Sequence, residues 1–383
     1  MKRAGNLYET ICSRENCMEA IREACRHKLH RPSARRLNAW PEAYVEYIML
    51  LLRTKTYVPS PYVVCTINDG ISKKQRVIHK PKLYPDLVIQ WALMRVIEPI
   101  IMRGAYYWSC GSIPGKGIHH GVQGMKRWLR QDPEETKYCL KLDVRKYYPS
   151  IDNQILKGQF RRVIKDDDTL WLIDTIIDSN EQGLPIGNYT SQWWSNFYLQ
   201  PLDHFIKEGI YIKGRGGKLL HFSAPYYCRY VDDLVIFGSN KKQLHAARRQ
   251  IFEFLEQELH LQVKGNWQLF KTDSRGVDFL GYRFFHDHTI LRKRNALRIA
   301  RRARKTARQK RPSVLNAQAM VSYYGALKHC DSHNFIEKHI KPYVNIGQLR
   351  KVISDASKKQ GAAQRGLQRG ENRRRPMRYL HST

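Results

Sequence analysis

Tyr226-Tyr-Cys-Arg-Tyr-Val-Asp-Asp-Leu-Val-Ile-Phe-Gly238 is the stretch that decides the fold of this chain. Its Val, Ile, Tyr and Phe residues favour strands and its adjacent aspartates favour a tight turn, so it predicts a hairpin with Asp232 and Asp233 at the tip. Because neighbouring strand residues point to opposite faces, one carboxylate could bind a metal ion while the other lies beside it. An acidic turn is usually just solvated, so a catalytic role requires a third carboxylate elsewhere.

A second apolar strand, Tyr138-Cys-Leu-Lys-Leu-Asp143, ends on such a carboxylate. Three converging carboxylates repel one another and are tolerated only if cations lie between them. Two Mg²⁺ ions held about 3.5 to 4 Å apart can activate an attacking hydroxyl and stabilise a leaving pyrophosphate. The sequence therefore predicts a site with two Mg²⁺ ions for nucleotidyl transfer.

With these two motifs the chain resembles the reverse transcriptases. Tyr230-Val-Asp-Asp233 is similar to the catalytic box of that family and Leu142-Asp-Val144 to its first aspartate motif. The resemblance implies an α+β fold, the right-hand polymerase, with fingers, a palm of antiparallel sheet with packed helices, and a helical thumb. It also implies that Asp143 and Asp232 bind the two Mg²⁺ ions with help from the Val144 carbonyl, and that Asp233 completes the acidic cluster.

The charge of the chain points to a polyanionic partner. Among 383 residues, 67 are Lys or Arg and 34 are Asp or Glu, which gives a formal net charge of +33. Nucleic acid is the leading candidate, and a membrane surface is the competitor. No apolar run approaches the roughly 18 to 20 residues of a membrane-spanning helix, and the first residues lack an apolar signal core. The 8 cysteines include no C-x-x-C pair, so we expect a cytoplasmic protein with reduced thiols, in a bacterial or phage-infected cell.

A basic hairpin is predicted near the start of the resemblance. Two strand-like segments, 62–67 and 75–78, flank a turn rich in Asn, Gly and Lys. In the reverse transcriptases such a hairpin belongs to the fingers and closes over the incoming triphosphate, which implies this role for Arg76 and Lys74. A merely solvated hairpin is the alternative.

Two further segments are implied to contact the nucleotide. Tyr148 follows Asp143 by five residues, where the family places an aromatic ring that excludes a 2′-hydroxyl; of Tyr147 and Tyr148, one is expected in the core. In the segment 182–192, Ile186, Gly187 and Gln192 match the form Ile-Gly-x-x-x-Ser-Gln, which resembles the reverse transcriptases of diversity-generating retroelements. This implies error-prone complementary DNA, substituted opposite template adenines, for mutagenic retrohoming into a variable gene.

The C-terminal part of the chain is implied to hold the primer and the duplex. Lys264 lies in a segment similar to the motif whose lysine is near the leaving pyrophosphate, although a surface lysine is the alternative. Segment 277–285 resembles the primer-grip hairpin. A basic helix without Asp or Glu follows and suits a duplex backbone; its candidate contacts are Arg292, Lys293, Arg294, Arg298, Arg301 and Arg302.

The expected organisation follows the family order. It comprises an N-terminal helical extension (1–55), fingers (56–135), the first palm segment (136–160), a connection between fingers and palm (161–185), the palm with the catalytic hairpin and primer grip (186–285), a basic helical thumb (286–350) and a basic, disordered tail (351–383).

The implied partners are a template RNA, the RNA/DNA hybrid, deoxynucleoside triphosphates and a small, basic, helical accessory oligomer, with no membrane. One rival is a reverse transcriptase of retron, group II intron or phage-defence type, against which Ile186 and Gln192 argue. A more distant rival is a non-catalytic RNA-binding scaffold, which would gain nothing from burying three carboxylates beside a polyanion. An RNA-templated RNA polymerase is disfavoured by Tyr148.

Overall fold

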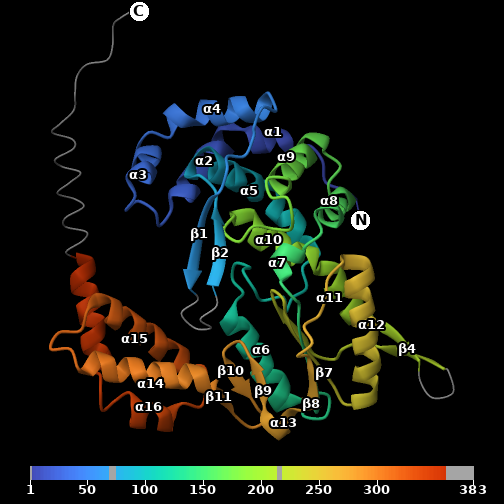
Figure 1. Ribbon diagram of the computed structural model, residues 1–383, viewed down its shortest axis with the longest axis vertical. Coiled ribbons are helices and arrows are strands. Elements are labelled where there is room, and N and C mark those ends of the chain that lie inside the picture. The colour runs from blue at the N-terminus through green and yellow to red at the C-terminus, as the bar shows by residue number, and fades with distance from the viewer. Residues whose placement is uncertain (1, 69–74, 214–217, 359–383) are drawn as a thin grey trace, which may run out of the picture. The chain divides into compact units, whose positions relative to one another are not determined.

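The structure, a computed structural model, describes residues 2–68, 75–213 and 218–358 of the chain. It combines helices with antiparallel sheets, so the expected α+β class is confirmed (Figure 1). The chain forms two compact units, Met1–Ser274 and Arg275–Thr383. In the part of the chain that the structure describes, none of the helices is both long and apolar enough to cross a membrane.

The first unit begins with the helices expected before residue 55. These are α1 (Tyr8–Cys12), α2 (Arg14–Cys25), α3 (Pro32–Ala39) and α4 (Glu42–Arg53), and α2 packs on α4 and on α5 (Val88–Arg103). Their apolar faces bury Ile21, Ile48 and Leu93 in one core. The basic composition of segment 26–36 predicts a linker, but its second half forms α3, where Pro32 takes the first helical position without losing a hydrogen bond.

The expected basic hairpin consists of β1 (Val63–Asn68) and β2 (Gln75–Lys80), which pair antiparallel. A short π-helical turn, η1 (Leu83–Leu87), leads into α5. The prolines at 85 and 99 predict a helix that ends at Pro99, and this is wrong because α5 continues through Pro99 to Arg103. Ile97, Ile100 and Ile101 are all buried on its apolar face, so core packing outweighs the local break.

The centre of the first unit is a four-stranded sheet with the order β6-β7-β3-β8. Its strands are β3 (Tyr138–Asp143), β6 (Tyr227–Tyr230), β7 (Asp233–Gly238) and β8 (Gln268–Lys271), and each pairs antiparallel with its neighbour. Leu140, Leu142 and Ile236 are fully or almost fully buried. Helix α12 (Lys241–Leu259) has the bounds predicted from its apolar spacing and packs on this sheet.

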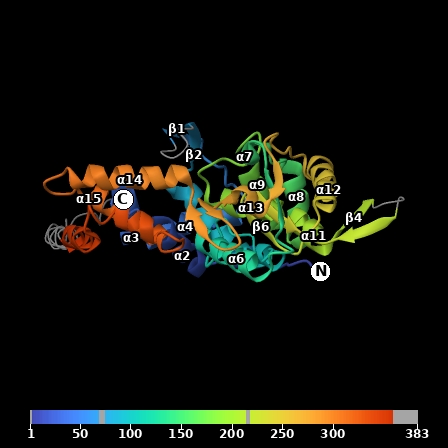
Figure 2. The ribbon, with the colours of Figure 1, turned by 90° about the horizontal axis from the view of Figure 1, so that it is seen from below.

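The remaining helices of the first unit surround the sheet and complete its core. They are α6 (Ile118–Gln131), α7 (Tyr147–Ser150), α8 (Asn153–Val163), α9 (Asp167–Ile177), α10 (Tyr189–Tyr198) and α11 (Gln200–Glu208). Asp166 caps α9, since its carboxylate accepts the Thr169 N–H at 3.2 Å. A hairpin that the sequence did not predict, β4 (Ile210–Lys213) with β5 (Leu219–Phe222), projects beside α12 (Figures 1 and 2).

The second unit has its own sheet and its own apolar core. The strands β9 (Val277–Phe279), β10 (Tyr282–Phe284) and β11 (Thr289–Leu291) form an antiparallel sheet with β10 in the middle. Helices α14 (Lys293–Ala307), α15 (Val314–Leu327) and α16 (His333–His339) follow, and Ile299, Met320 and Leu327 lie in the core. The expected primer-grip hairpin thus lies in this unit, after α13 (Thr272–Arg275). Residues 346–358 are helical, so helix continues past the expected start of the tail at 351.

Candidate active site

Strands β6 and β7 form the predicted acidic hairpin, joined by Val231 and Asp232. Tyr230 pairs with Asp233, so Asp233 already opens the second strand and only Asp232 lies in the turn itself. Val231 has a φ of 58°, a left-handed conformation that a β-branched residue rarely adopts. Such strain persists only where the surrounding structure imposes it, and it is concentrated at functional sites.

The third carboxylate lies beside this hairpin, as the sequence predicted. Strand β3 pairs with β7 in a register that sets Asp143 directly opposite Asp233. The next residue, Val144, donates its backbone N–H to the Asp232 carbonyl at 3.2 Å. The structure therefore brings Asp143, Asp232 and Asp233 to one end of the central sheet.

The two hairpin carboxylates share an unfavourable electrostatic environment. Burial, with a further contribution from the negative charge of Asp143, raises the pKa of Asp232 to about 6. Burial likewise raises the pKa of Asp233 to about 6, although the Lys141 ammonium opposes the shift. Carboxyls with pKa values raised in this way lack sufficient positive charge around them, and this is the environment that a bound cation would relieve.

Two lysines provide part of the missing positive charge. The Lys264 ammonium donates to Asp143 Oδ1 at 2.5 Å, and Lys141 Nζ lies 3.5 Å from Asp233 Oδ1. The Lys264 backbone N–H also donates to the Asp143 carbonyl at 2.8 Å, so this lysine is tied to the acidic cluster. Among the residues that the structure describes, no three His, Cys, Asp or Glu side chains are placed to hold a metal ion together. The oxygen donors suit a hard divalent cation, which would have to compete with Lys264 for Asp143.

The tyrosines after Asp143 divide into a core residue and a residue beside the acidic cluster. Tyr147 is 3% exposed and donates its hydroxyl to the Ser195 carbonyl, so it is the core member of the pair. Tyr148 is only partly buried and accepts a hydrogen bond from the Ser195 hydroxyl at 3.3 Å. Burial raises the pKa of Tyr148, and both Asp232 and Arg76 are close enough to influence it. Tyr148 is thus near both Asp232 of the acidic cluster and Arg76 of the basic hairpin.

The glycine-containing segment before α10 packs both against Tyr148 and against β2 of the basic hairpin. Gly183, with a φ of 67°, lies so close to the chain that a Cβ would meet the Tyr148 carbonyl oxygen at 2.4 Å. Gly187, with a φ of 132°, would place a Cβ 2.4 Å from the His79 carbonyl oxygen on β2. The Ile186 carbonyl in turn accepts the His79 N–H at 2.8 Å. Only glycine permits both approaches, and this explains why the segment requires it at these positions.

The other predicted nucleotide contacts lie at the edges of this arrangement. Arg76 is exposed on β2, opposite Ile67 of β1. Gln192 is exposed on α10, and its carbonyl accepts hydrogen bonds from Ser195 and Asn196, both at 3.0 Å. Lys74 lies outside the described residues.

The basic residues predicted on α14 of the second unit fall into two groups. Lys293, Arg294 and Arg301 are exposed. The other three have partners within the unit: Arg292 pairs with Asp278, the Arg298 guanidinium lies 5.1 Å from the Tyr323 ring centroid, and Arg302 donates to Asn316 Oδ1 at 2.5 Å. The exposed group is therefore better suited to contact a nucleic acid backbone.

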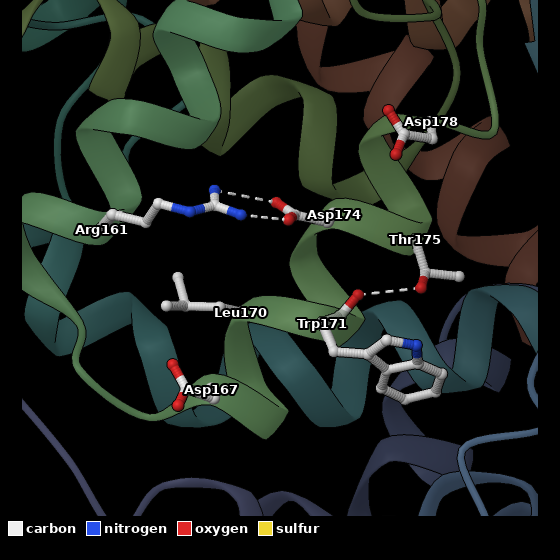
Figure 3. Close-up of a pocket in the computed structure, with 7 residues that line it drawn as sticks. All are labelled: Arg161, Asp167, Leu170, Trp171, Asp174, Thr175 and Asp178. Carbon is white, nitrogen blue, oxygen red and sulfur yellow. Dashed lines mark hydrogen bonds and ion pairs between the residues drawn. The ribbon is translucent and has the colours of Figure 1, made fainter.

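A surface pocket of about 430 Å³ between α8 and α9 contains none of the predicted site residues (Figure 3). Arg161 and Asp174 form an ion pair at 2.5 Å in it, and the Trp171 carbonyl accepts the Thr175 hydroxyl at 2.8 Å. These groups already satisfy one another, and no feature of this pocket indicates a ligand.

Sequence reasoning did not identify two residues that shape the acidic cluster. Lys141 is a charged residue within an apolar strand, and that exception to the pattern was the available signal. Gly111 lies against the turn, where a Cβ would meet Val231 Cγ2 at 2.4 Å. The sequence pattern around Gly111 did not indicate this contact, because it depends on a segment far away in the chain.

Comparison with protein families finds one matching model. Residues 71–284 match the family described as "Reverse transcriptase (RNA-dependent DNA polymerase)". Protein YkfC of Escherichia coli strain K12 is 26% identical over 243 residues, covering 55% of this chain and 62% of that protein. The retron Ec73 reverse transcriptase of Escherichia coli is 25% identical over 234 residues, covering 57% of this chain and 69% of that protein. The chain thus spans less than two thirds of the length of Protein YkfC.

Solved structures with partial similarity include yeast telomerases. Apo telomerase from Candida tropicalis aligns with 76% of this chain and 55% of its own, with a TM-score of 0.47 and 12% identity. Telomerase from Candida albicans in complex with a fragment of telomeric RNA aligns with 83% of this chain and 62% of its own, with a TM-score of 0.44 and 10% identity. Both scores lie below 0.5.

Proposed function

The chain belongs to the reverse transcriptase family, and from this membership we propose that it is an RNA-directed DNA polymerase. One observation carries the proposal. The register that sets Asp143 opposite Asp233, together with the hydrogen bond between Val144 and the Asp232 carbonyl, gathers three carboxylates at one end of the sheet. Clusters of carboxylates such as this one bind the divalent cations that catalyse nucleotidyl transfer.

In the proposed reaction a primer 3′-hydroxyl attacks the α-phosphate of a deoxynucleoside triphosphate. A new bond forms between the primer 3′-oxygen and the α-phosphorus, the bond from that phosphorus to the leaving pyrophosphate breaks, and the hydroxyl proton passes to solvent water. Asp143, Asp232, Asp233 and the Val144 carbonyl would hold two Mg²⁺ ions, whose chemistry is to activate the hydroxyl and stabilise the developing charge. Lys264, bound to Asp143 at 2.5 Å, would lie near the pyrophosphate and provide its proton.

The remaining predicted residues would bind and select the nucleotide. Arg76, with Lys74 outside the described residues, would contact the triphosphate. Tyr148 would pack against the sugar and exclude a 2′-hydroxyl; its proximity to both Arg76 and Asp232 supports this. Ile186, Gly187 and Gln192 would surround the templating base pair.

The exposed cations of α14 would hold the RNA template and the RNA/DNA hybrid through the phosphate backbone. This part of the proposal rests on Lys293, Arg294 and Arg301, on a helix that contains no Asp or Glu. Arg292, Arg298 and Arg302 would support the helix through their own internal contacts.

The finer proposal is that the enzyme serves a diversity-generating retroelement. It would copy a template-repeat RNA with substitutions opposite adenine, and a small basic helical oligomer would assist it. The aliphatic Ile186 and the pair Ser191-Gln192 support this subclass. The similarity to the retron Ec73 reverse transcriptase favours the alternative, a retron enzyme with ordinary fidelity.

The deciding experiment is RNA-templated incorporation of deoxynucleotides with Mg²⁺, comparing the wild type with Asp232→Ala/Asp233→Ala, followed by sequencing of the product. We expect synthesis by the wild type, its loss in the variant, and errors concentrated opposite template adenines. Accurate synthesis would retain the polymerase and favour the retron alternative. If no product forms even with cognate RNA and cell extract, the non-catalytic RNA-binding scaffold is the remaining alternative.

A second assay tests the sugar gate. Tyr148→Ala is expected to raise ribonucleotide use by about 10- to 100-fold relative to deoxynucleotides, because the ring would no longer meet the 2′-hydroxyl. Tyr147→Phe is the matched control, since that ring is in the core and loses only its hydroxyl bond to Ser195. Equal sugar selection in Tyr148→Ala and the wild type would remove this role from Tyr148.

A further inference from the structure

Arg229 on β6 is a fully buried cation directly behind the catalytic turn, with 0% exposure. Its guanidinium forms a fork with Asp203 of α11: Nε donates to Oδ1 at 2.7 Å and Nη2 to Oδ2 at 2.5 Å. Asp203 also accepts the Tyr227 hydroxyl at 2.7 Å. Neither charge is left unpaired, which is the condition for burying such a pair. The fork therefore fixes the guanidinium plane.

The rest of the guanidinium is directed at the turn. Nη1 donates to the Val231 carbonyl and to Asn196 Oδ1, each at 3.1 Å. Val231 is the strained residue, with its φ of 58°, immediately before Asp232. The bond from Arg229 thus holds the one peptide whose orientation determines where the Asp232 carboxylate points.

Asn196 of α10 connects the Arg229 side chain with the backbone of Gly111. Its Oδ1 accepts from Arg229, while its Nδ2 donates to the Gly111 carbonyl at 2.7 Å. Gly111 lies against Val231 so closely that a Cβ would be 2.4 Å from Cγ2 and 2.8 Å from the backbone nitrogen. A side chain can rotate away from such a contact, but a backbone nitrogen within a hairpin cannot.

Resting on the proposed polymerase function, we propose that Arg229 and Asn196 are positioning residues that hold the Val231 peptide, and with it Asp232, against the backbone of Gly111. They touch neither substrate nor reacting atoms. The turn is held by a charge-assisted hydrogen bond from Arg229 and by close packing on Gly111, and Asn196 links the two. Small displacements of a catalytic group reduce rates strongly, and this gives the network a functional consequence beyond stability.

The central experiment compares Asn196→Leu with Asn16→Leu in the full chain. Asn16 is a matched control within the first unit: it is 8% exposed against 5% for Asn196, accepts from Arg95 at 3.0 Å, and donates to the Ile11 and Ala92 carbonyls. Each variant removes the hydrogen bonds that a buried amide makes with an arginine and with backbone carbonyls, so both are expected to lower the melting temperature. Only Asn196 contacts the residues around the turn.

We would measure kcat and KM for single-nucleotide incorporation on an RNA template with a DNA primer, and Kd for that duplex. The values of kcat are expressed per folded molecule. We expect Asn196→Leu to lower kcat by about 10- to 100-fold while KM and Kd change less than about 3-fold. Asn16→Leu should retain wild-type kcat. Wild-type kcat in Asn196→Leu, or an equal loss of kcat in both variants, would overturn the proposal.

A second pair of variants tests the close packing of Gly111 on Val231 without removing a polar group. Gly111→Ala places a methyl group against Val231, whereas Gly158→Ala on α8 places one where no heavy atom lies within 4 Å. We expect a loss of kcat of about 10-fold or more for Gly111→Ala and none for Gly158→Ala. Equal kcat in the two variants would remove Gly111 from the network. A wild-type chain that binds the duplex but never incorporates nucleotides would instead overturn the proposed function, and this inference with it.

Discussion

The acidic cluster around Asp232 and the basic face of α14 are the two main concentrations of charge in the proposal, and they differ in burial. Asp232 and Asp233 are partly buried, and this burial raises the pKa of each to about 6. Lys293, Arg294 and Arg301 are exposed on a helix without acidic residues. Buried charge in a fixed geometry can stabilise a reaction, at the expense of stability, whereas exposed charge attracts any polyanion and is screened by salt.

Removing charge is therefore expected to have different effects in the acidic cluster and on α14. In the cluster it should abolish chemistry, alter its pH dependence and stabilise the fold. On α14 it should weaken binding in a salt-dependent manner and leave chemistry and stability unchanged.

The largest expected effect is that of Asp232→Asn on the rate of incorporation. The substitution keeps the shape of the side chain but removes its charge, so kcat should fall by on the order of 10⁴-fold, as for other essential catalytic groups. Duplex Kd should remain within about 3-fold, because α14 is unchanged. Rapid-quench single-turnover kinetics measure the first quantity and fluorescence anisotropy the second. Residual activity within 10-fold of the wild type would refute a catalytic role for Asp232.

The second effect concerns binding of the RNA/DNA hybrid by Lys293→Gln/Arg294→Gln/Arg301→Gln. Three fewer phosphate contacts should lower the slope of log K against log salt by about 2 to 3 and weaken binding about 100-fold at moderate salt. The matched control is Lys241→Gln/Lys242→Gln/Arg249→Gln, which removes the same charge from exposed positions of α12. Equal weakening by both triple variants would show that net charge, rather than α14, is responsible.

The third effect is the pH dependence of kcat. Asp232 and Asp233 are ionised above about pH 6 and become protonated below it. At sub-saturating Mg²⁺, where protons compete with the cation for these carboxylates, the apparent kcat should therefore fall at least about 10-fold per pH unit below pH 6, while duplex binding changes little because lysine and arginine keep their charge. A profile at sub-saturating Mg²⁺ that is flat down to pH 5 would contradict the partly buried, mutually repelling arrangement of the carboxylates.

The smallest effect is on stability. Since folding raises the pKa of Asp232 above its ordinary value, the folded state binds the proton more tightly than the unfolded state does. Stability then rises as pH falls from 7 through 6 towards 4, and at pH 7.5 the charged form costs stability. Asp232→Asn should therefore be more stable than the wild type at pH 7.5 by on the order of 1 kcal/mol. Lys293→Gln should leave the free energy of unfolding unchanged. Chemical denaturation of both variants and the wild type at pH 7.5 and at pH 4 measures these differences.

Local sequence patterns predicted the acidic hairpin, helix α12 and the three candidate carboxylates. Alternation of Val, Ile and Tyr around two aspartates predicts a hairpin, and the spacing of Leu244, Ile251 and Leu255 predicts α12 with its observed bounds. These patterns are local, so they can be recognised without knowing what each segment packs against. The continuation of α5 through Pro99 was not predictable, because burial of its apolar face outweighed a local signal.

The contacts between these residues depend on the tertiary structure. The register that sets Asp143 against Asp233 joins segments about ninety residues apart, and the fork between Arg229 and Asp203 depends on α11 packing behind β6. An arginine within a strand pattern looks solvated in sequence, since nothing local shows that a buried partner exists. Desolvation and hydrogen-bond geometry are properties of the packed state, and for that reason the raised pKa of Asp232 and the restraint on Val231 appear only in the fold.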